Sequence, residues 1–481
     1  MLEDRIYRYL GLYYSSPPWV KALAGRVYRT IPFRFRYGQV YAHFKNLLQS
    51  SQFWSRDQIA DYQTQKMGAL IHHGYHHVPY YQNIMTANGL HPSQFLSLSE
   101  LRQFPFLRKE DIIQHKEKLV AVNYPKTKLL HYSTGGTMGT PLSFYNEKGV
   151  SRSKELAFMT TQWERVEYHL NDPLVTIRGN VVPSARRDHY WEYEPIKNRL
   201  VFSSYHMTDD NLKNYVKKIR EFKPKYIHTY PSAAMILAKY MKDRNESPFP
   251  TVRALLCSSE AFTPGQREFL EGIFQCRIFS WYGLGEMVAL AGECEVSANY
   301  HIFPEYGIFE LVDPQGRVID REGELGEIVG TGFDRDIMPF IRYRTGDYAE
   351  YLDQACACGR NHRLLKRVEG RWLQEHIITK KGNLISITAL NMHSPIFEHV
   401  KRYQFVQEVS GTVILRVVPN RLYMEDDTRR IHHAFLQKFD ARDIEFSIQL
   451  ADDSQIEIGL TGKFKFLIQK GVRPGEKADH E

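Results

Sequence analysis

The pattern of hydrophobic and polar positions changes three times along this chain. From residue 54 to 85, apolar side chains recur at helical spacing, which predicts helices. Between residues 128 and 280, short apolar runs alternate with helical segments, which predicts parallel β/α units. Beyond residue 306, short strands follow one another with glycine turns, a texture typical of a small β-barrel. Residues 371–481 have the length and pattern of an independent α+β domain.

Local signals place several of these elements. Thr208, followed by two aspartates, is typical of a helix N-cap, and Lys223-Pro224 ends that helix after Phe222. A strand follows, and Pro231 opens the next helix. Further predicted elements are strands over 225–230, 253–257, 277–280, 412–418 and 444–450, and helices over 264–274 and 425–439.

We therefore predict an α/β fold with several domains, because 481 residues exceed the ~250–300 at which single cores stop growing. The expected organisation is a basic, aromatic helical cap over residues 1–53, a large domain over 54–370 and a small domain over 371–481. The large domain would combine α/β sheet subdomains with the small β-barrel. The C-terminal domain would be α+β.

Composition excludes several classes of protein. With 43% hydrophobic and 25% charged residues, the chain is neither disordered nor fibrous. The sequence has no run of ~18 apolar residues, so it predicts no transmembrane helix. The first residues lack the basic segment followed by an apolar segment that is typical of a secretory signal. Five cysteines are too few for a disulfide scaffold, so we expect a cytoplasmic enzyme.

Charge narrows the choice of partners only slightly. The 63 basic and 55 acidic residues give a net charge of +8, which fits an anionic substrate, cofactor or membrane face. We expect no nucleic-acid partner, because no recognition motif accompanies the charge. Much of the excess lies among the aromatic residues of 1–50. We interpret this segment as a helical cap packed through its aromatics, with peripheral membrane contact as the alternative.

Glycine and hydroxyl residues crowd the segment 131–141. Such a loop can turn its backbone N–H groups and hydroxyls toward phosphate oxygens. It is not a P-loop, since no lysine follows the last glycine, and on its own it is equally typical of a flexible turn. The candidate phosphate-binding residues are Ser133, Thr134, Gly135, Gly136, Thr137 and Gly139.

Three further segments carry polar side chains where ligands commonly bind. Tyr282 and Glu286 follow a predicted strand, at the carboxyl edge of an open sheet. Asp347 comes directly after a turn, where a carboxylate can accept two hydrogen bonds from ribose hydroxyls. Lys463 lies on a glycine-hinged loop. Taken singly, these are also typical of exposed turn residues.

In this order and at these separations, the four segments resemble the acyl-adenylate-forming superfamily. The resemblance is strongest to its phenylacetate–CoA ligase branch, with the related capsule-polysaccharide biosynthesis (CapK-like) proteins, and covers residues 54 to 469. It implies that ATP activates a carboxylic acid as an acyl-adenylate, with release of pyrophosphate, and that CoA then takes the acyl group as a thioester. An amine or hydroxyl acceptor in cell-surface polysaccharide biosynthesis is the alternative to CoA.

The resemblance also implies a role for each candidate residue. The loop from Ser133 would hold the phosphates, and the small C-terminal domain would be mobile about a hinge. Adenine would be bound by Tyr282, Gly283, Ser259 and Glu260, and the ribose by Asp347 and Arg371. Glu286 would bind Mg²⁺, and Lys463 would be the catalytic residue. By their position, the residues that would line the pocket for the acid are Tyr230, Pro231, Ser232 and Ala233.

The sequence departs from the family pattern at several positions. Gly285 stands where a threonine usually precedes the magnesium-binding glutamate. Leu373-Gln374 replaces the acidic pair at the hinge, and Glu457-Ile-Gly459 replaces the usual residues before the catalytic lysine. These changes bear more on thioester formation than on adenylation. A non-catalytic basic membrane-associated scaffold is the alternative from another class, and the presence of Glu286, Asp347 and Lys463 speaks against it.

The cysteines suggest a separate metal site. Cys294 and His301 precede Cys356 and Cys358, and three thiolates with one imidazole satisfy tetrahedral Zn²⁺. Four protein ligands leave no open coordination position, so the predicted zinc is structural. The same four positions resemble those of the phenylacetate–CoA ligase branch.

Overall fold

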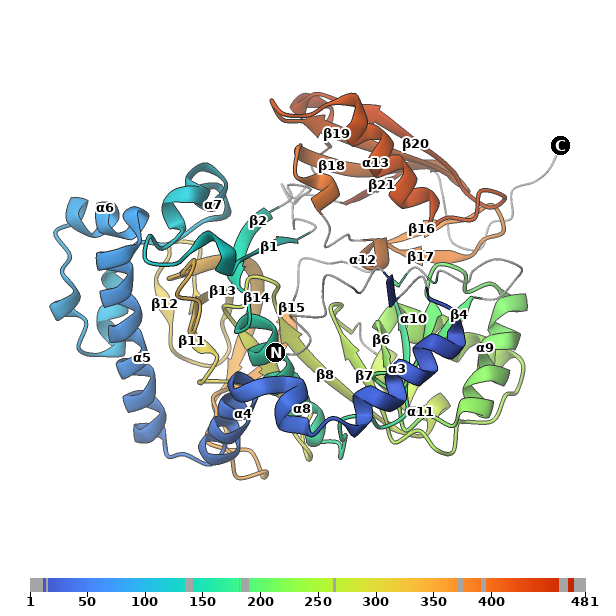
Figure 1. Cartoon of the computed structure of the whole chain (residues 1–481), viewed down its shortest axis with the longest axis horizontal. Coiled ribbons are helices and arrows are strands. Elements are labelled where there is room, and N and C mark those ends of the chain that lie inside the picture. The colour runs from blue at the N-terminus through green and yellow to red at the C-terminus, as the bar shows by residue number, and fades with distance from the viewer. Residues whose placement is uncertain are drawn as a thin grey trace.

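A long mixed sheet runs through the body of the molecule, and a smaller sheet forms the C-terminal unit (Figure 1). The computed structural model describes residues 12–13, 16–134, 142–180, 182, 190–262, 265–369, 375–390, 395–457 and 466–470. Within these ranges the long sheet has 13 strands, in the order β12-β11-β13-β14-β15-β10-β9-β8-β7-β6-β3-β5-β4. No helix in the described part is long and apolar enough to cross a membrane.

The predicted parallel β/α units form one half of this sheet. Its neighbouring strands β5, β3, β6, β7 and β8 are parallel, and β4 pairs antiparallel at the edge. The predicted N-cap is confirmed, because the Thr208 side chain accepts a hydrogen bond from the backbone N–H of Asn211. The bounds are β3 (Leu174–Arg178), β4 (Trp191–Glu194), β5 (Arg199–Ser203), β6 (Tyr226–Thr229), β7 (Ala254–Ser258), β8 (Arg277–Gly283), α9 (Asp209–Phe222), α10 (Pro231–Asp243) and α11 (Gln266–Phe274).

Helices cover both faces of the parallel strands. Leu255 of β7 packs into a core with α9, α10 and α11, whereas Leu256 packs into a second core on the other face. That second core contains Tyr41 and Phe44 of α4 (Phe33–Ser51) and Phe158 of α8 (Ser151–Glu164). Burial on both faces explains why these strands are continuous apolar runs.

The strands beyond residue 290 continue the same sheet. Antiparallel pairs join β8 to β9 and β9 to β10, and then connect β15, β14, β13, β11 and β12 in turn. The expectation of a separate small β-barrel is therefore not confirmed. The bounds are β9 (Leu290–Gly292), β10 (Tyr300–Ile302), β11 (Gly307–Val312), β12 (Val318–Ile319), β13 (Leu325–Gly332), β14 (Tyr343–Leu352) and β15 (Leu364–Glu369).

The N-terminal part is helical, as its sequence predicts. From residue 16 onward the described part of the cap contains α3 (Pro18–Thr30) and α4, and α4 packs on α8 through its aromatic side chains. The helices predicted between residues 54 and 85 are α5 (Arg56–His77) and α6 (Pro79–Ala87), which bury Met67, Ile71 and Met85. Then follow α7 (Lys109–His115) and a hairpin of β1 (Leu129–Thr134) and β2 (Leu142–Glu147).

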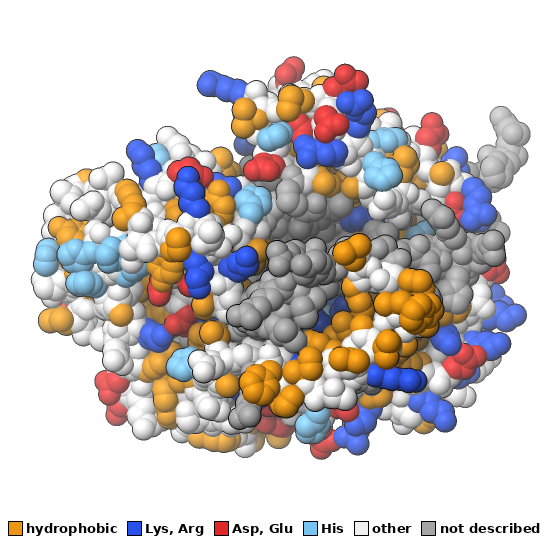
Figure 2. All heavy atoms as spheres, viewed as in Figure 1, with side chains coloured by type: hydrophobic (Ala, Val, Ile, Leu, Met, Phe, Trp, Pro, Cys, Tyr) orange, Lys and Arg blue, Asp and Glu red, His pale blue; other side chains and the backbone are white. Residues whose placement is uncertain are grey.

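One face of α3 is apolar and exposed. Lys21, Gly25 and Tyr28 face the body, where Lys21 pairs with Glu192. Trp19, Leu23 and Val27 lie on the opposite face, and Figure 2 shows hydrophobic side chains gathered near this helix. The helical cap is thus observed, and membrane contact stays a prediction without support from known relatives.

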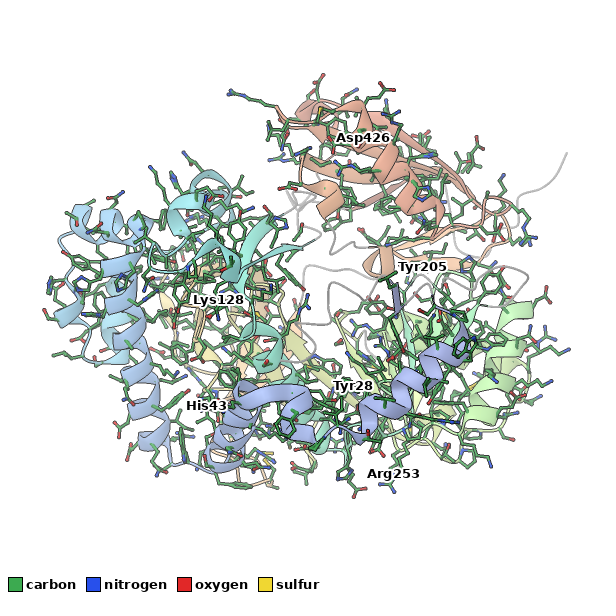
Figure 3. All side chains as sticks on the ribbon, viewed as in Figure 1. Tyr28, His43, Lys128, Tyr205, Arg253 and Asp426 are labelled. Carbon is green, nitrogen blue, oxygen red and sulfur yellow. The ribbon has the colours of Figure 1, made fainter. Side chains whose placement is uncertain are left out.

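The C-terminal unit has its own sheet and core. Its sheet has the order β20-β19-β18-β21, and α13 packs Ile431 and Phe435 into the core. Tyr205 of the body belongs to this core and lies between the two parts (Figure 3). The domain boundaries after residues 53 and 370, and the mobility of the C-terminal unit, stay predictions. The bounds are β16 (His376–Ile378), β17 (Leu384–Ser386), α12 (Ile387–Leu390), β18 (Val400–Val409), β19 (Thr412–Pro419), α13 (Glu425–Leu436), β20 (Glu445–Leu450) and β21 (Leu467–Gln469).

Candidate active site

The predicted adenine and ribose residues meet at the end of β8. Tyr282 is the last but one residue of β8, before the exposed Gly283, and its hydroxyl donates to Oδ2 of Asp347 at 2.9 Å. Asp347 lies on β14 and is buried. β8 and β14 are four positions apart in the sheet, which would separate them by ~19 Å if the sheet were flat. The sheet therefore curls, and this curvature brings together two residues that are distant in sequence.

Glu286 lies close to this pair, on the loop after β8. It is buried, and its Oε1 accepts a hydrogen bond from the Tyr343 hydroxyl at 3.3 Å. Tyr343 opens β14, the strand that carries Asp347. A hard carboxylate oxygen suits Mg²⁺. Within the described residues, Glu286 belongs to no group of three or more acids, histidines or cysteines spaced for a metal ion. The site therefore fits an ion that arrives with the nucleotide phosphates.

The β1–β2 hairpin brings the start of the phosphate loop against the Glu286 loop. A Cβ placed on Gly285 would lie 3.0 Å from Cγ2 of Thr134 and 3.2 Å from Cε1 of Tyr132. This close approach accounts for glycine where the family usually has threonine. Ser133 is buried, and its hydroxyl has no hydrogen-bond partner within the described ranges. A buried hydroxyl of this kind is normally satisfied, which is consistent with a ligand contact here.

Glu260 holds the start of α10 rather than facing an open cleft. Its carboxylate accepts from the backbone N–H of Ser232 at 2.8 Å and from the Ser232 hydroxyl at 2.9 Å. Pro231, Ser232 and Ala233 are all buried, and Tyr230 is half-buried. Of the four residues predicted to line the acid pocket, Tyr230 is therefore the one that can contact a ligand through its side chain.

One side chain at this edge was not predicted from the sequence. Arg178, the last residue of β3, donates from Nη2 to the hydroxyl of Ser259 at 2.8 Å and packs over the ring of Tyr230 at 4.4 Å. Ser259 has a positive φ of 70°, which places its hydroxyl beside Arg178. The signal that could have identified Arg178 is a basic residue at the end of an otherwise apolar strand.

Several predicted residues lie outside the described ranges. These are Gly135, Gly136, Thr137 and Gly139 of the phosphate loop, Arg371 at the hinge and the catalytic candidate Lys463. Their assignments stay predictions.

The predicted zinc ligands are gathered in one place. The ligand atoms of Cys294, His301, Cys356 and Cys358 all lie within 4.8 Å of one another. The sulfurs of Cys294 and Cys356 are 3.6 Å apart, and the Cys358 sulfur is 3.7 Å from Nε2 of His301. Tetrahedral zinc with Zn–S bonds of about 2.3 Å separates its ligands by roughly 3.8 Å, so the donor set and its spacing fit the ion.

Electrostatics favour the ligand form of the imidazole. Burial, with the positive charges of Arg165 and Arg360, lowers the pKa of His301 to about 3. The ring is therefore neutral at physiological pH, as a metal ligand must be. Arg360 forms a salt bridge with Glu295 and donates to Gln52, which connects the cluster to the end of α4. The cluster follows the far end of β14, away from Asp347.

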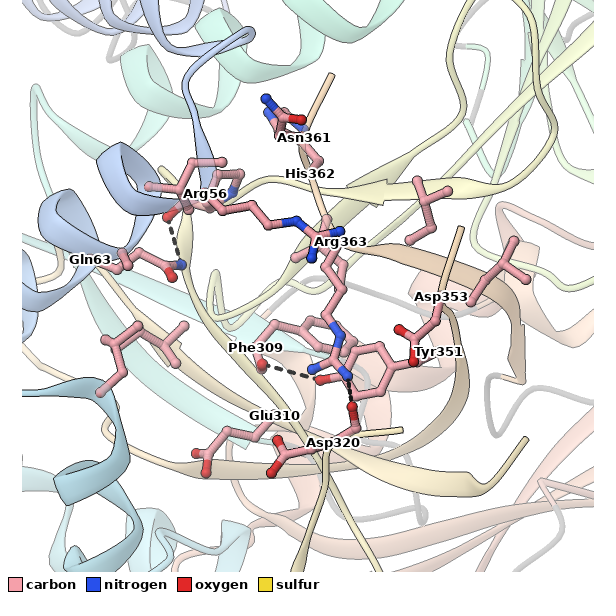
Figure 4. A pocket seen from close by; sticks show the side chains of 18 of the residues that line it. Arg56, Gln63, Phe309, Glu310, Asp320, Tyr351, Asp353, Asn361, His362 and Arg363 are labelled. Atoms are coloured by element: carbon pink, nitrogen blue, oxygen red, sulfur yellow. Dashed lines mark hydrogen bonds between the residues drawn. The ribbon is translucent and has the colours of Figure 1, made fainter. Parts of the chain in front are cut away.

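A cavity of about 740 Å³ lies between α5 and the antiparallel strands (Figure 4). Its lining includes none of the predicted active-site residues. Figure 4 shows Arg363 between Tyr351 and Asp320; the guanidinium lies 3.3 Å from the Tyr351 ring and donates to the Asp320 carbonyl. Arg102 pairs with the Asp320 carboxylate at 2.7 Å. These charged groups bind one another, and the cavity is separate from the candidate active site.

Comparisons with known proteins agree with the resemblance that the motifs indicate. No family model matches the chain. It is 25% identical over 348 residues to protein CapK of Staphylococcus aureus, a match covering 71% of this chain and 74% of CapK. It is 26% identical over 365 residues to phenylacetate-coenzyme A ligase of Thermus thermophilus, covering 74% and 80%. The chain is a relative of CapK and of the phenylacetate–CoA ligases. The resemblance seen in the sequence is thereby confirmed.

A solved structure shares the fold. The chain superposes on 2-hydroxyisobutyryl-CoA ligase in complex with 2-HIB-AMP and CoA with a TM-score of 0.58 and 17% identity, over 87% of this chain and 91% of that one. A second structure of that ligase, in the postadenylation state, gives a TM-score of 0.56. This likeness confirms a mixed α/β fold of the adenylate-forming CoA ligase type.

Proposed function

We propose that this chain is an adenylate-forming ligase that activates a carboxylic acid with ATP and passes the acyl group to CoA. The expectation that it is an enzyme of this class is borne out by relatives named as ligases. The observation that carries the proposal is the contact between Tyr282 and Asp347, with Glu286 close by on the same loop. These residues come from two segments predicted separately from the sequence, 280–286 and 342–347, and this contact joins them.

In the first step, a carboxylate oxygen attacks the α-phosphorus of ATP. A P–O bond forms, the bond to the β-phosphate breaks, and pyrophosphate leaves. Asp347 would accept hydrogen bonds from the ribose, and the ring of Tyr282 would lie along the adenine. Thr134 and Ser133 would donate to the phosphates, and Glu286 would bind the Mg²⁺ that offsets their charge. Lys463 would stabilise the negative charge that develops at the α-phosphate.

In the second step, the CoA thiolate attacks the acyl carbon and AMP leaves. The relatives named phenylacetate-coenzyme A ligase support CoA as the acceptor. The relative named CapK supports the alternative, an amine or hydroxyl acceptor in cell-surface polysaccharide biosynthesis. The second-step motifs, which depart from the family pattern, lie mostly outside the described residues, in the ranges 371–374 and 458–465. Glu457, which begins the second motif, is described and forms salt bridges with Arg416 and Lys470.

We further infer that the cysteine cluster binds structural zinc, because its four donors lie at tetrahedral spacing. The few cysteines elsewhere continue to favour a cytoplasmic location. The non-catalytic scaffold is disfavoured because Glu286 and Asp347, the acids that the family resemblance assigns to Mg²⁺ and ribose, are both present and lie beside the same pair of strands.

The test is ATP–pyrophosphate exchange with the purified chain and a panel of carboxylic acids. We expect exchange with at least one acid, and a loss of about 100-fold or more in Lys463→Ala and in Asp347→Ala. Lys401→Ala, an exposed lysine of the C-terminal unit, is the matched control and is expected to keep full exchange. Absence of exchange with every acid would favour the scaffold. A thioester assay with CoA then separates the two acceptors.

A further inference from the structure

The carboxyl edge of the parallel strands holds a guanidinium whose described partners are all uncharged. Nη1 of Arg178 donates to Oγ of Ser258 at 3.1 Å and to Nε2 of His228, and Nη2 donates to Oγ of Ser259 at 2.8 Å. Burial, followed by the positive charges of Arg178 and Arg199, lowers the pKa of His228 well below its usual value. The imidazole is therefore a neutral acceptor, and it supplies no counter-charge.

Other arginines of the long sheet are paired with acids. Arg342 binds the carboxylate of Glu310 through two nitrogens, and Arg344 binds Glu327. Among the described residues, Arg178 has no carboxylate within ion-pair distance. Glu260, next to its partner Ser259, is turned to the start of α10. Arg178 is half-buried, so its charge is partly exposed and an anionic ligand can reach it without displacing a described protein acid.

Arg178 also has hydrogen-bond donors to spare. A guanidinium offers five N–H groups. The acceptors described account for three of them, two on Nη1 and one on Nη2. Two donors remain, including the one on Nε, and a carboxylate can bind such a pair side-on. The Tyr230 ring packs against the guanidinium and holds it in place.

The position of Arg178 separates it from the reacting end of the site. In the sheet order β8-β7-β6-β3, its strand lies about 14 Å from β8, the strand that leads to Glu286. The guanidinium reaches back only as far as the ends of β6 and β7, where His228 and Ser258 lie. It thus faces Tyr230, the one predicted acid-pocket side chain that is partly exposed, and not the contact between Thr134 and Gly285.

We propose that the acid activated by this chain carries a second anionic group, such as a distal carboxylate, and that Arg178 binds it. This inference deepens the proposed function and rests on it. The reacting carboxyl group meets the α-phosphate near Thr134 and Glu286, while the distal anion pairs with Arg178. A nucleotide phosphate offers the same chemistry to a guanidinium, and the experiment separates the two sources.

The experiment compares matched pairs of acids in ATP–pyrophosphate exchange: hexanoate with adipate, and phenylacetate with 4-carboxyphenylacetate. We expect kcat/KM to be about 10- to 100-fold higher for the dianionic member of a pair, the range of a charge-assisted hydrogen bond. Arg178→Met is expected to remove this preference. Because Arg178 also donates to Ser259, a predicted adenine contact, any rise in the KM for ATP is expected to be equal for both members of each pair. Arg178→Lys is expected to retain part of it.

Two controls make the result decisive. Arg253→Met replaces an exposed arginine just before β7, at the opposite end of the strand (Figure 3), and is expected to keep the preference. Melting curves of each variant with and without adipate, but without ATP, report binding when a variant is inactive. We expect adipate to raise the melting temperature of the native chain but not of Arg178→Met.

Three outcomes would overturn the inference. Equal use of both members of each pair by the native chain excludes a distal anion. A preference for the dianionic acid that survives in Arg178→Met, together with a rise in the KM for ATP, assigns the guanidinium to the nucleotide. A melting temperature that adipate leaves unchanged in the native chain excludes binding. Exchange with monoanionic acids alone overturns this inference while sustaining the proposed function, whereas no exchange with any acid overturns the proposed function.

Discussion

Gly285 brings the start of the predicted phosphate loop against the loop that carries Glu286. The side chain of Thr134 lies so close that a Cβ on Gly285 would be 3.0 Å from Cγ2 of Thr134. A larger residue at position 285 therefore has to displace the start of the loop that would hold the phosphates. Glycine at this position therefore lets the two loops approach closely, and we expect them to stay in contact without the usual threonine.

We expect Gly285→Thr to destabilise the chain by about 1–2 kcal/mol and to raise the KM for ATP, because the new side chain overlaps Thr134. Chemical denaturation and exchange kinetics measure both effects. Thr134→Ser removes Cγ2 and keeps the hydroxyl, so the double variant is expected to recover most of the loss. Additive effects of the two substitutions would contradict this explanation.

At the scale of elements, the strand ends decide what the active site contains. The carboxyl ends of β3, β6, β7 and β8 bring Arg178, Tyr230, Ser259 and Tyr282 to one edge. The other end of β14 leads to the cysteine cluster, where β10 contributes His301. The proposed nucleotide site and the predicted zinc site therefore lie toward opposite ends of connected strands, so we expect the metal to act on the stability of the sheet.

We expect the purified chain to hold one zinc ion and Cys356→Ser to lose it, lowering the melting temperature by several degrees. Metal content by atomic absorption and the thermal transition measure this. Cys276→Ser replaces a cysteine outside the cluster and is expected to keep both the zinc and the melting temperature. Equal melting temperatures for native chain and Cys356→Ser would remove the structural role.

At the scale of the whole molecule, the C-terminal unit meets the body at a buried lysine. Lys438 lies just after α13, donates from Nζ to the Leu390 carbonyl at 3.2 Å, and lies 5.4 Å from the ring of Tyr205. Burial lowers the pKa of Lys438 to about 7. Because the unfolded chain binds this proton up to its ordinary pKa of about 10.4, the lysine costs most stability at pH 7 and below, and the cost fades as pH rises toward 10.

Lys438→Met is therefore expected to stabilise the chain by roughly 2–4 kcal/mol at pH 6.5, from 1.36 kcal/mol per pKa unit, and by much less at pH 9.5. Denaturation at the two pH values measures the difference. Lys213→Met, at an exposed position of α9, is expected to change stability little and equally at both. A gain from Lys438→Met that is independent of pH would show that the folded and the unfolded chain bind the Lys438 proton equally, and thus that burial does not lower this pKa.

Local patterns were enough to predict the parallel β/α half, the helical cap and the family of the chain. Apolar strand sequences, the N-cap at Thr208 and the prolines that end helices each act within a few residues. Burial on both faces of the sheet requires apolar residues along the whole of each parallel strand, so these strands are recognisable in the sequence. The four motifs were recognised for the same reason, since each is a short loop with its own chemistry. The sequence could also pair the cysteines with His301, because thiolate and imidazole are the ligands zinc prefers.

Only the tertiary structure decided how these pieces meet. The short strands and glycine turns beyond residue 306 predict a small barrel, yet these strands continue the long sheet through their hydrogen bonds. The sequence could not show this, because strand pairing depends on partners that are distant in sequence. The curl that joins Tyr282 to Asp347, the turning of Glu260 toward Ser232, and the neutral surroundings of Arg178 all arise from contacts across strands. Sequence specifies which groups are available, whereas three-dimensional packing determines which of them neutralise one another and which stay available for a ligand.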